Sequence, residues 1–179
     1  MKRLLWIALS ILLLMPCLSY CEEAGETETV DINGKFALTC TVPDGYYYEE
    51  TQVDEELIIG RLEPMDGLRP TILFGVAESE TYAGMTLNDF SEEDLAVEMQ
   101  LAAEDMADPR VTLGETSHGT KLIIAQDMDP ANSCLDITTV YKGYYITFLM
   151  YPSIDGTLLT EEQVGMAIDF LSDLWMVEK

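Results

Sequence analysis

The chain has 179 residues, a length that fits one domain of ordinary size. Its 33 acidic and nine basic residues leave a formal charge of −24. Such a charge excludes nucleic acid as a partner, because contacts to phosphate supply most of that affinity. We therefore expect a cationic or neutral partner, such as a protein of the cell envelope.

The first 21 residues have the pattern of an export signal. Lys2-Arg3 is a basic segment, and residues 4–15 form an apolar run shorter than the ~20 residues that a membrane-spanning helix needs. The small residues Ser19 and Cys21 predict cleavage after Cys21. Removal of this signal peptide (1–21) takes away two basic and no acidic residues, so the mature chain has a formal charge of −26. We expect the mature protein to be secreted or held at the cell surface.

Two other outcomes are possible for this N-terminus. Leu18-Ser19-Tyr20-Cys21 is similar to a lipoprotein signal except at Tyr20, where a small residue is usual. Lipidation of Cys21 is therefore the alternative to its removal, and we expect membrane attachment only in that case. The other alternative is an uncleaved N-terminal anchor.

Residues 22–29 form an acidic lead-in without periodicity, and a single domain is expected over 30–177. Alternation of apolar residues and turn signals predict early strands at 30–32, 36–42, 56–63 and 70–77. Pro43-Asp44-Gly45 ends the second of these. The three tyrosines at 46–48 favour a packed strand or rim over a binding platform.

A helix is predicted from Ser91, with Asp94 as its capping-box partner. Its apolar stripe consists of Leu95, Met99, Ala102 and Met106, and Pro109 ends it by about Asp108. Methionines at helical spacing favour core packing over a soft-metal site. The acidic residues at 92–94 and Glu98 are expected on a solvated helix face.

The second half of the chain is predicted to form two hairpins and a helix. Residues 111–116 and 121–127 form the first hairpin, and 135–141 and 144–151 form the second around Lys142-Gly143. The strand at 144–151 is apolar at nearly every position, which indicates cover on both faces. The last helix follows a capping box at 160–163, with Val164, Ala167, Ile168, Leu171 and Trp175 as its buried stripe.

This order predicts an α+β fold with a single curved, mainly antiparallel sheet and helices packed on its faces. The opening strand Phe36-x-Leu38-x-Cys40-x-Val42-Pro43-Asp44-Gly45-Tyr46, the mid-chain helix, the late meander and the closing amphipathic helix resemble the PsbP-like fold group. The resemblance covers about residues 30–177. It implies an α/β/α sandwich and an accessory or binding role, and it carries no catalytic residues.

Candidate chemistry in the chain is sparse. His118, the one histidine, lies in a Ser-His-Gly-Thr turn and is expected to be a turn residue without a catalytic role. Asp127-x-Asp129-Pro130-x-Asn132 begins like a calcium loop, but Ala131 and Thr138 stand at positions that ligands should occupy. An ordinary Asp/Asn turn, with at most weak calcium binding, is the expectation. We expect no cofactor and no catalytic or metal site.

Cys40 and Cys134 are the thiols that remain after cleavage at Cys21. Export to an oxidising compartment favours a disulfide between them, which would close a loop of 94 positions. Strand parity argues against it, because Cys40 shares a face with Leu38 while Cys134 shares one with Asp136. We expect the bridge, with two separate thiols as the alternative.

Two functional classes remain. The absence of a nucleophile–base signature favours an exported, non-catalytic accessory or binding domain. The alternative is a small extracellular hydrolase that uses acidic residues. A deep pocket with converging carboxylates would distinguish the second from the first.

Overall fold

The computed structural model describes residues 27–32, 36–53, 57–154, 156–172 and 175–178. The predicted signal peptide, the lipidation site Cys21 and most of the acidic lead-in lie outside the described residues. None of the described helices is long and apolar enough to cross a membrane.

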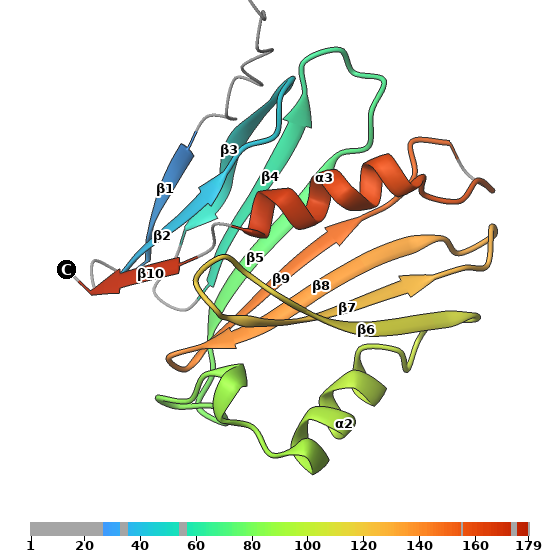
Figure 1. Ribbon diagram of the computed structural model, residues 1–179. Helices are drawn as coiled ribbons and strands as arrows, with labels where there is room; N and C mark the ends of the chain where they lie inside the picture. The colour runs from blue at the N-terminus through green and yellow to red at the C-terminus, as the bar shows by residue number, and fades with distance from the viewer. Residues whose placement is uncertain (1–26, 33–35, 54–56, 155, 173–174, 179) are drawn as a thin grey trace, which may run out of the picture.

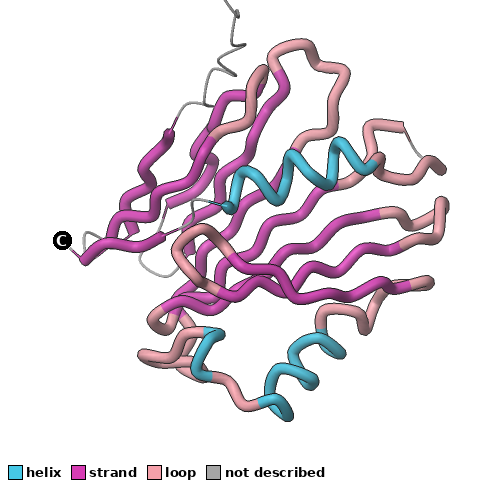
Figure 2. The backbone as a smooth tube through the Cα atoms, viewed as in Figure 1, coloured by secondary structure: helices cyan, strands magenta, loops and turns pink. Residues whose placement is uncertain are grey.

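The described chain contains strands, two α-helices and a 3-10 helix (Figures 1 and 2). The strands are β1 (Thr27–Ile32), β2 (Phe36–Thr41), β3 (Tyr46–Val53), β4 (Leu57–Pro64), β5 (Ile72–Glu78), β6 (Pro109–Glu115), β7 (Lys121–Asp127), β8 (Cys134–Tyr141), β9 (Tyr144–Met150) and β10 (Trp175–Glu178). The helices are η1 (Leu87–Asp89), α2 (Glu92–Leu101) and α3 (Glu161–Ser172).

The strands form two antiparallel sheets. The larger has seven strands in the order β3-β4-β5-β9-β8-β7-β6, and the smaller has the order β1-β2-β10. The predicted α+β class is confirmed, and the predicted hairpins all form. The prediction of a single sheet missed the smaller one, because it placed Trp175 in the last helix, whereas Trp175 begins β10 and pairs with Thr39 of β2.

Helix α3 and the smaller sheet cover one face of the larger sheet (Figure 1). The predicted capping box forms, since Thr160 Oγ1 accepts from the backbone N–H of Gln163 at 3.2 Å and Gln163 Oε1 accepts from that of Thr160 at 2.9 Å. Phe170 is fully buried between Phe74 of β5 and Phe148 of β9, with ring centroids 5.8 and 5.2 Å away. These aromatic contacts fix α3 over the centre of the sheet.

Helix α2 and η1 cover part of the opposite face. Ser91 accepts from the backbone N–H of Asp94 at 3.1 Å, which confirms the predicted start of α2. Leu95 packs against Ile123 of β7 and Val140 of β8, and Met99 packs beside it. Because the two helices lie on opposite faces of the larger sheet, the α/β/α arrangement is confirmed.

Helix α2 ends earlier than predicted, at Leu101 instead of near Asp108. Met106 therefore lies outside the helix. The segment after α2 is held differently, because the buried carboxylate of Asp127 accepts the backbone N–H groups of Ala107 at 2.8 Å and of Asp108 at 3.0 Å. These bonds fix the end of the segment at the start of β6, while the residues just after Leu101 form turns in which the N–H groups of Ala103 and Glu104 donate to the oxygens of Gln100 and Leu101.

The β8–β9 hairpin turns as predicted. Lys142 and Gly143 both have positive φ, 50° and 89°, which is the geometry of a type I′ turn. A Cβ at Gly143 would lie 2.9 Å from the backbone nitrogen of Gly84, so the turn also requires a residue without a side chain. Buried and half-buried residues alternate along β9, with the buried set facing α3.

Candidate functional site

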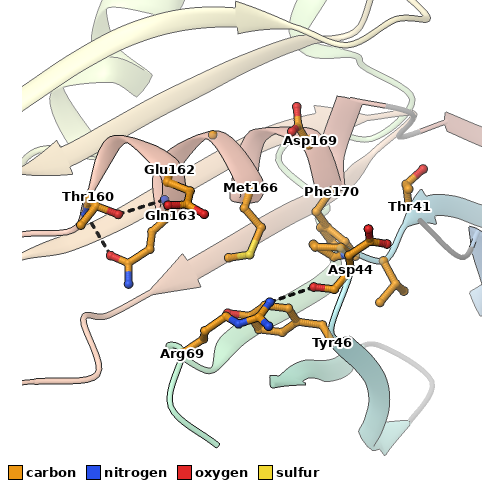
Figure 3. A pocket seen from close by; sticks show the side chains of 13 residues that line it. Thr41, Asp44, Tyr46, Arg69, Thr160, Glu162, Gln163, Met166, Asp169 and Phe170 are labelled. Carbon is orange, nitrogen blue, oxygen red and sulfur yellow. Dashed lines mark hydrogen bonds between the residues drawn. The ribbon is translucent and has the colours of Figure 1, made fainter. Parts of the chain in front are cut away.

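An open cleft of about 1040 Å³ lies between α3 and the turn that joins β2 to β3 (Figure 3). We call it the α3 cleft. Its apolar lining includes Val42, Tyr46 and Phe170, which are buried in the core, and Met166, whose half-buried side chain is open to solvent. Figure 3 shows Met166 extending from α3 toward Tyr46 on the opposite wall. The cleft therefore presents the accessible side chain of Met166 beside buried residues of the core.

Arg69 forms part of the wall opposite α3. Its Nε donates to Asp66 Oδ2 at 2.9 Å, its Nη1 donates to the backbone oxygen of Asp44 at 2.9 Å, and the guanidinium carbon lies 5.6 Å from the ring centre of Tyr46. A Cβ at Gly45 would lie 2.7 Å from the guanidinium, so the predicted Pro-Asp-Gly turn also makes room for Arg69. Arg69 thus joins the β2–β3 and β4–β5 turns and has part of its charge neutralised.

Tyr46 anchors the same wall from within. Its hydroxyl donates to the backbone oxygen of Pro70 at 3.0 Å. Burial raises the pKa of Tyr46 to about 12, so the hydroxyl stays protonated and remains a donor at physiological pH. Of the tyrosines at 46–48, Tyr46 is buried and Tyr47 is exposed, as expected for a strand at the rim of a sheet.

Carboxylates line the α3 cleft beside this apolar surface. Glu162 comes from the first turn of α3 and Asp44 from the β2–β3 turn, and Figure 3 places them on either side of Met166. Asp169 also lines the cleft, but in Figure 3 its carboxylate points away from Met166. Arg69 is the one cationic side chain among the described lining residues. The arrangement suits a group that is both apolar and cationic.

The structure places His118 away from this cleft. It lies exposed in the β6–β7 turn and stacks on Trp175 of β10, with ring centroids 5.2 Å apart. The backbone N–H of Ser117 also donates to the oxygen of Ser172 at 2.7 Å, where α3 ends. These contacts give His118 a packing role at the junction of the turn with α3 and β10.

The Asp127–Asn132 segment uses its carboxylates to bind its own backbone. Besides Ala107 and Asp108, Asp127 accepts the N–H of Asp129 at 2.9 Å, and Asp129 accepts that of Ala131 at 3.0 Å. These backbone bonds hold the pKa of Asp127 below its usual value. No cluster of three or more potential metal ligands occurs in the described parts of the chain.

The structure does not join Cys40 to Cys134, contrary to the predicted bridge. Cys40 is buried in the core that faces α3. Cys134 is half-buried at the start of β8 and shares the opposite face of the larger sheet with Asp136, and burial raises the pKa of its thiol. The sheet therefore separates the two side chains, as strand parity indicates.

The acidic residues of α2 do not all lie on a solvated face. Glu92 and Glu93 are exposed, and Asp94 belongs to the cap. Glu98 departs from the prediction, because it is half-buried and accepts the hydroxyl of Tyr82 at 2.7 Å. This bond fastens α2 to the loop that follows β5.

The residues of the α3 cleft were not recognised from the sequence. They come from 41–46, from Arg69 and from 160–170, segments that are separated by up to about 130 positions. Local patterns indicated the turn at 43–45 and the helix cap at 160–163. No local signal indicated that these two elements face each other.

Comparisons with known proteins concern the fold. No family model matches the chain, and no curated protein matches it in sequence. Among solved structures, the chain is similar to the solution structure of cyanobacterial PsbP (CyanoP) from Synechocystis sp. PCC 6803, with a TM-score of 0.49 and 11% sequence identity over 92% of this chain and 99% of that chain. No residue role and no function are carried over from this structure.

Proposed function

We propose that the protein is an exported, non-catalytic accessory domain that binds a cationic or neutral protein partner in the α3 cleft. The observation that carries this proposal is the cleft itself, in which an accessible apolar surface lies beside Glu162 and Asp44. Concave apolar surfaces with a few polar groups are the usual form of binding sites. The export signal at 1–21 supports a role outside the cytoplasm.

The positions of the described carboxyl groups favour a binding domain over a hydrolase that uses acidic residues. A glycoside hydrolase of the common type needs a pair of carboxyl groups at the substrate, one of them with a raised pKa. The carboxyl group whose pKa burial raises, to about 6, is that of Asp136. Asp136 lies on the face of the larger sheet opposite α3, away from the cleft. The described lining of the cleft also includes no histidine and no cysteine.

Site-specific photo-crosslinking in the cell that makes the protein tests this proposal. Met166 is replaced with photoreactive benzoylphenylalanine, and the matched control carries the same group at Val97, which is half-exposed on α2. We expect light to produce a discrete protein adduct from position 166 and little or none from position 97. Failure to form an adduct at 166, or equal adducts at both positions, would contradict binding in the α3 cleft.

A further inference from the structure

Apolar side chains are exposed on the two loops that border the α3 cleft. Met65 and Leu68, in the β4–β5 loop, are 71% and 79% exposed, and Ile154, in the β9–α3 connection, is 69% exposed. Contiguous exposed apolar side chains with polar neighbours mark protein interaction surfaces in soluble proteins. Methionine is common on such surfaces, because its flexible thioether adapts to different partners.

The strand register places these loops at the same end of the molecule. Ile72, which begins β5, pairs with Met150, which ends β9, so the loop before β5 and the connection after β9 leave neighbouring strands side by side. Both segments also reach the cleft, since Arg69 and Thr160 line it together. A ligand that extends out of the cleft at this end therefore reaches the two loops that carry these exposed apolar side chains.

The acidic side chains of the cleft favour a ligand that carries positive charge. Arg69 is committed to Asp66 and to the backbone of Asp44, which leaves Glu162 and the Asp44 carboxylate without a cation of their own among the described lining residues. Helix α3 (161–172) has no lysine or arginine in its sequence. Lysine and arginine side chains suit such a site, because their methylene stems pack on apolar surface while their charged ends meet carboxylates.

We infer that the α3 cleft and its two flanking loops recognise an extended segment of a partner protein in which basic and apolar residues alternate. A basic side chain of that segment lies along Met166 toward Glu162 and Asp44, and its apolar neighbours contact Met65, Leu68 and Ile154. This inference rests on the proposed function and specifies the chemistry of the partner.

Fluorescence anisotropy with defined peptides tests the chemistry. The probe is acetyl-Leu-Arg-Leu-Lys-Leu-amide carrying a dye. One reference peptide has glutamate at both basic positions, and a second has serine in place of each leucine. We expect the probe to bind the full protein at least about tenfold more tightly than either reference, because both kinds of contact contribute. Equal binding of the three peptides would overturn the inference.

Matched variants test the location. Glu162→Gln with Asp44→Asn should weaken probe binding by about tenfold, because it removes the two cleft carboxylates that lie on either side of Met166. The control, Glu92→Gln with Glu93→Gln, makes the same change in charge on α2, on the opposite face, and should change the affinity by less than about twofold. Equal losses in the two double variants would show attraction by net charge alone and would refute the site.

A second pair of variants tests the apolar contacts. Met65→Ser with Leu68→Ser should weaken binding of the probe by about tenfold but leave binding of the serine reference peptide nearly unchanged. Val97→Ser with Leu101→Ser changes similarly exposed side chains on α2 and should leave probe affinity unchanged. Loss of binding in the second pair, or no loss in the first, would contradict contact with the β4–β5 loop. If crosslinking at position 166 captures a protein but the probe does not bind, the partner chemistry is wrong and the accessory function stands.

Discussion

Replacing Asp136 with asparagine should stabilise the protein, and by an amount that depends on pH. Asp136 lies in the middle of β8, beside Ala125 of β7 and Leu149 of β9, and its side chain accepts one hydroxyl hydrogen bond, from Thr147 at 3.2 Å. Burial raises the pKa of this carboxyl group from 3.8 to about 6. Asparagine has the same shape and retains an acceptor oxygen for Thr147, but it has no charge to bury.

The sign and size of the effect follow from the pKa. Below about pH 3.8 the carboxyl group is neutral in both the folded and the unfolded chain, so ionisation does not affect stability. Between about pH 3.8 and 6 the unfolded chain loses the proton while the folded protein keeps it, and stability falls as pH rises. At 1.36 kcal/mol per pH unit, the loss reaches about 3 kcal/mol above pH 6, which is an upper value because the side chain retains some contact with water.

Urea denaturation of the two proteins at about pH 4 and about pH 7.5 measures this effect. The free energy of unfolding of Asp136→Asn should exceed that of the wild type by up to about 3 kcal/mol at the higher pH and by little at the lower. Asp105→Asn, at an exposed position, is the control and should show no pH-dependent gain. The same gain at both pH values, or a loss at about pH 7.5, would refute the reasoning.

Three further changes test the packing. Phe170→Ala should lower the free energy of unfolding by about 3–5 kcal/mol in urea titrations, because it removes a fully buried ring that packs between two others; a loss below about 1 kcal/mol would contradict this packing. Gly143→Ala should cost at least about 1 kcal/mol and more than Gly67→Ala, since both have positive φ but only position 143 is crowded; equal melting temperatures would refute this. Asp127→Asn should speed hydrogen exchange at the backbone N–H of Ala107. The reason is that asparagine replaces one acceptor oxygen with an NH2 group, which cannot accept a hydrogen bond from that N–H. In the wild type, the hydrogen bonds to the Asp127 carboxylate should stabilise the protein fully above about pH 3.8, and this stabilisation should be lost as the pH falls through the lowered pKa of Asp127. Unchanged exchange at Ala107 in Asp127→Asn would argue against this role.

Features encoded by a few neighbouring residues could be predicted from the sequence. The capping box at Ser91 and Asp94 depends on residues three positions apart, and the β8–β9 turn depends on Lys142-Gly143. Alternation along the strands also identified the sheet, because a period of two places one set of side chains in the core. The α+β class followed from these local patterns, and the nearly all-apolar strand at 144–151 indicated that both faces of the sheet are covered.

Only the tertiary structure decided the features that depend on distant segments. β10 forms because Met176 packs into the core and the strand pairs with β2, about 140 residues earlier. The predicted bridge between Cys40 and Cys134 is absent because the larger sheet lies between their side chains. The α3 cleft exists because Arg69 holds two turns together opposite Met166. Local patterns specify which face of an element is buried, but they do not specify which other element covers it, because that depends on long-range packing and on strand order.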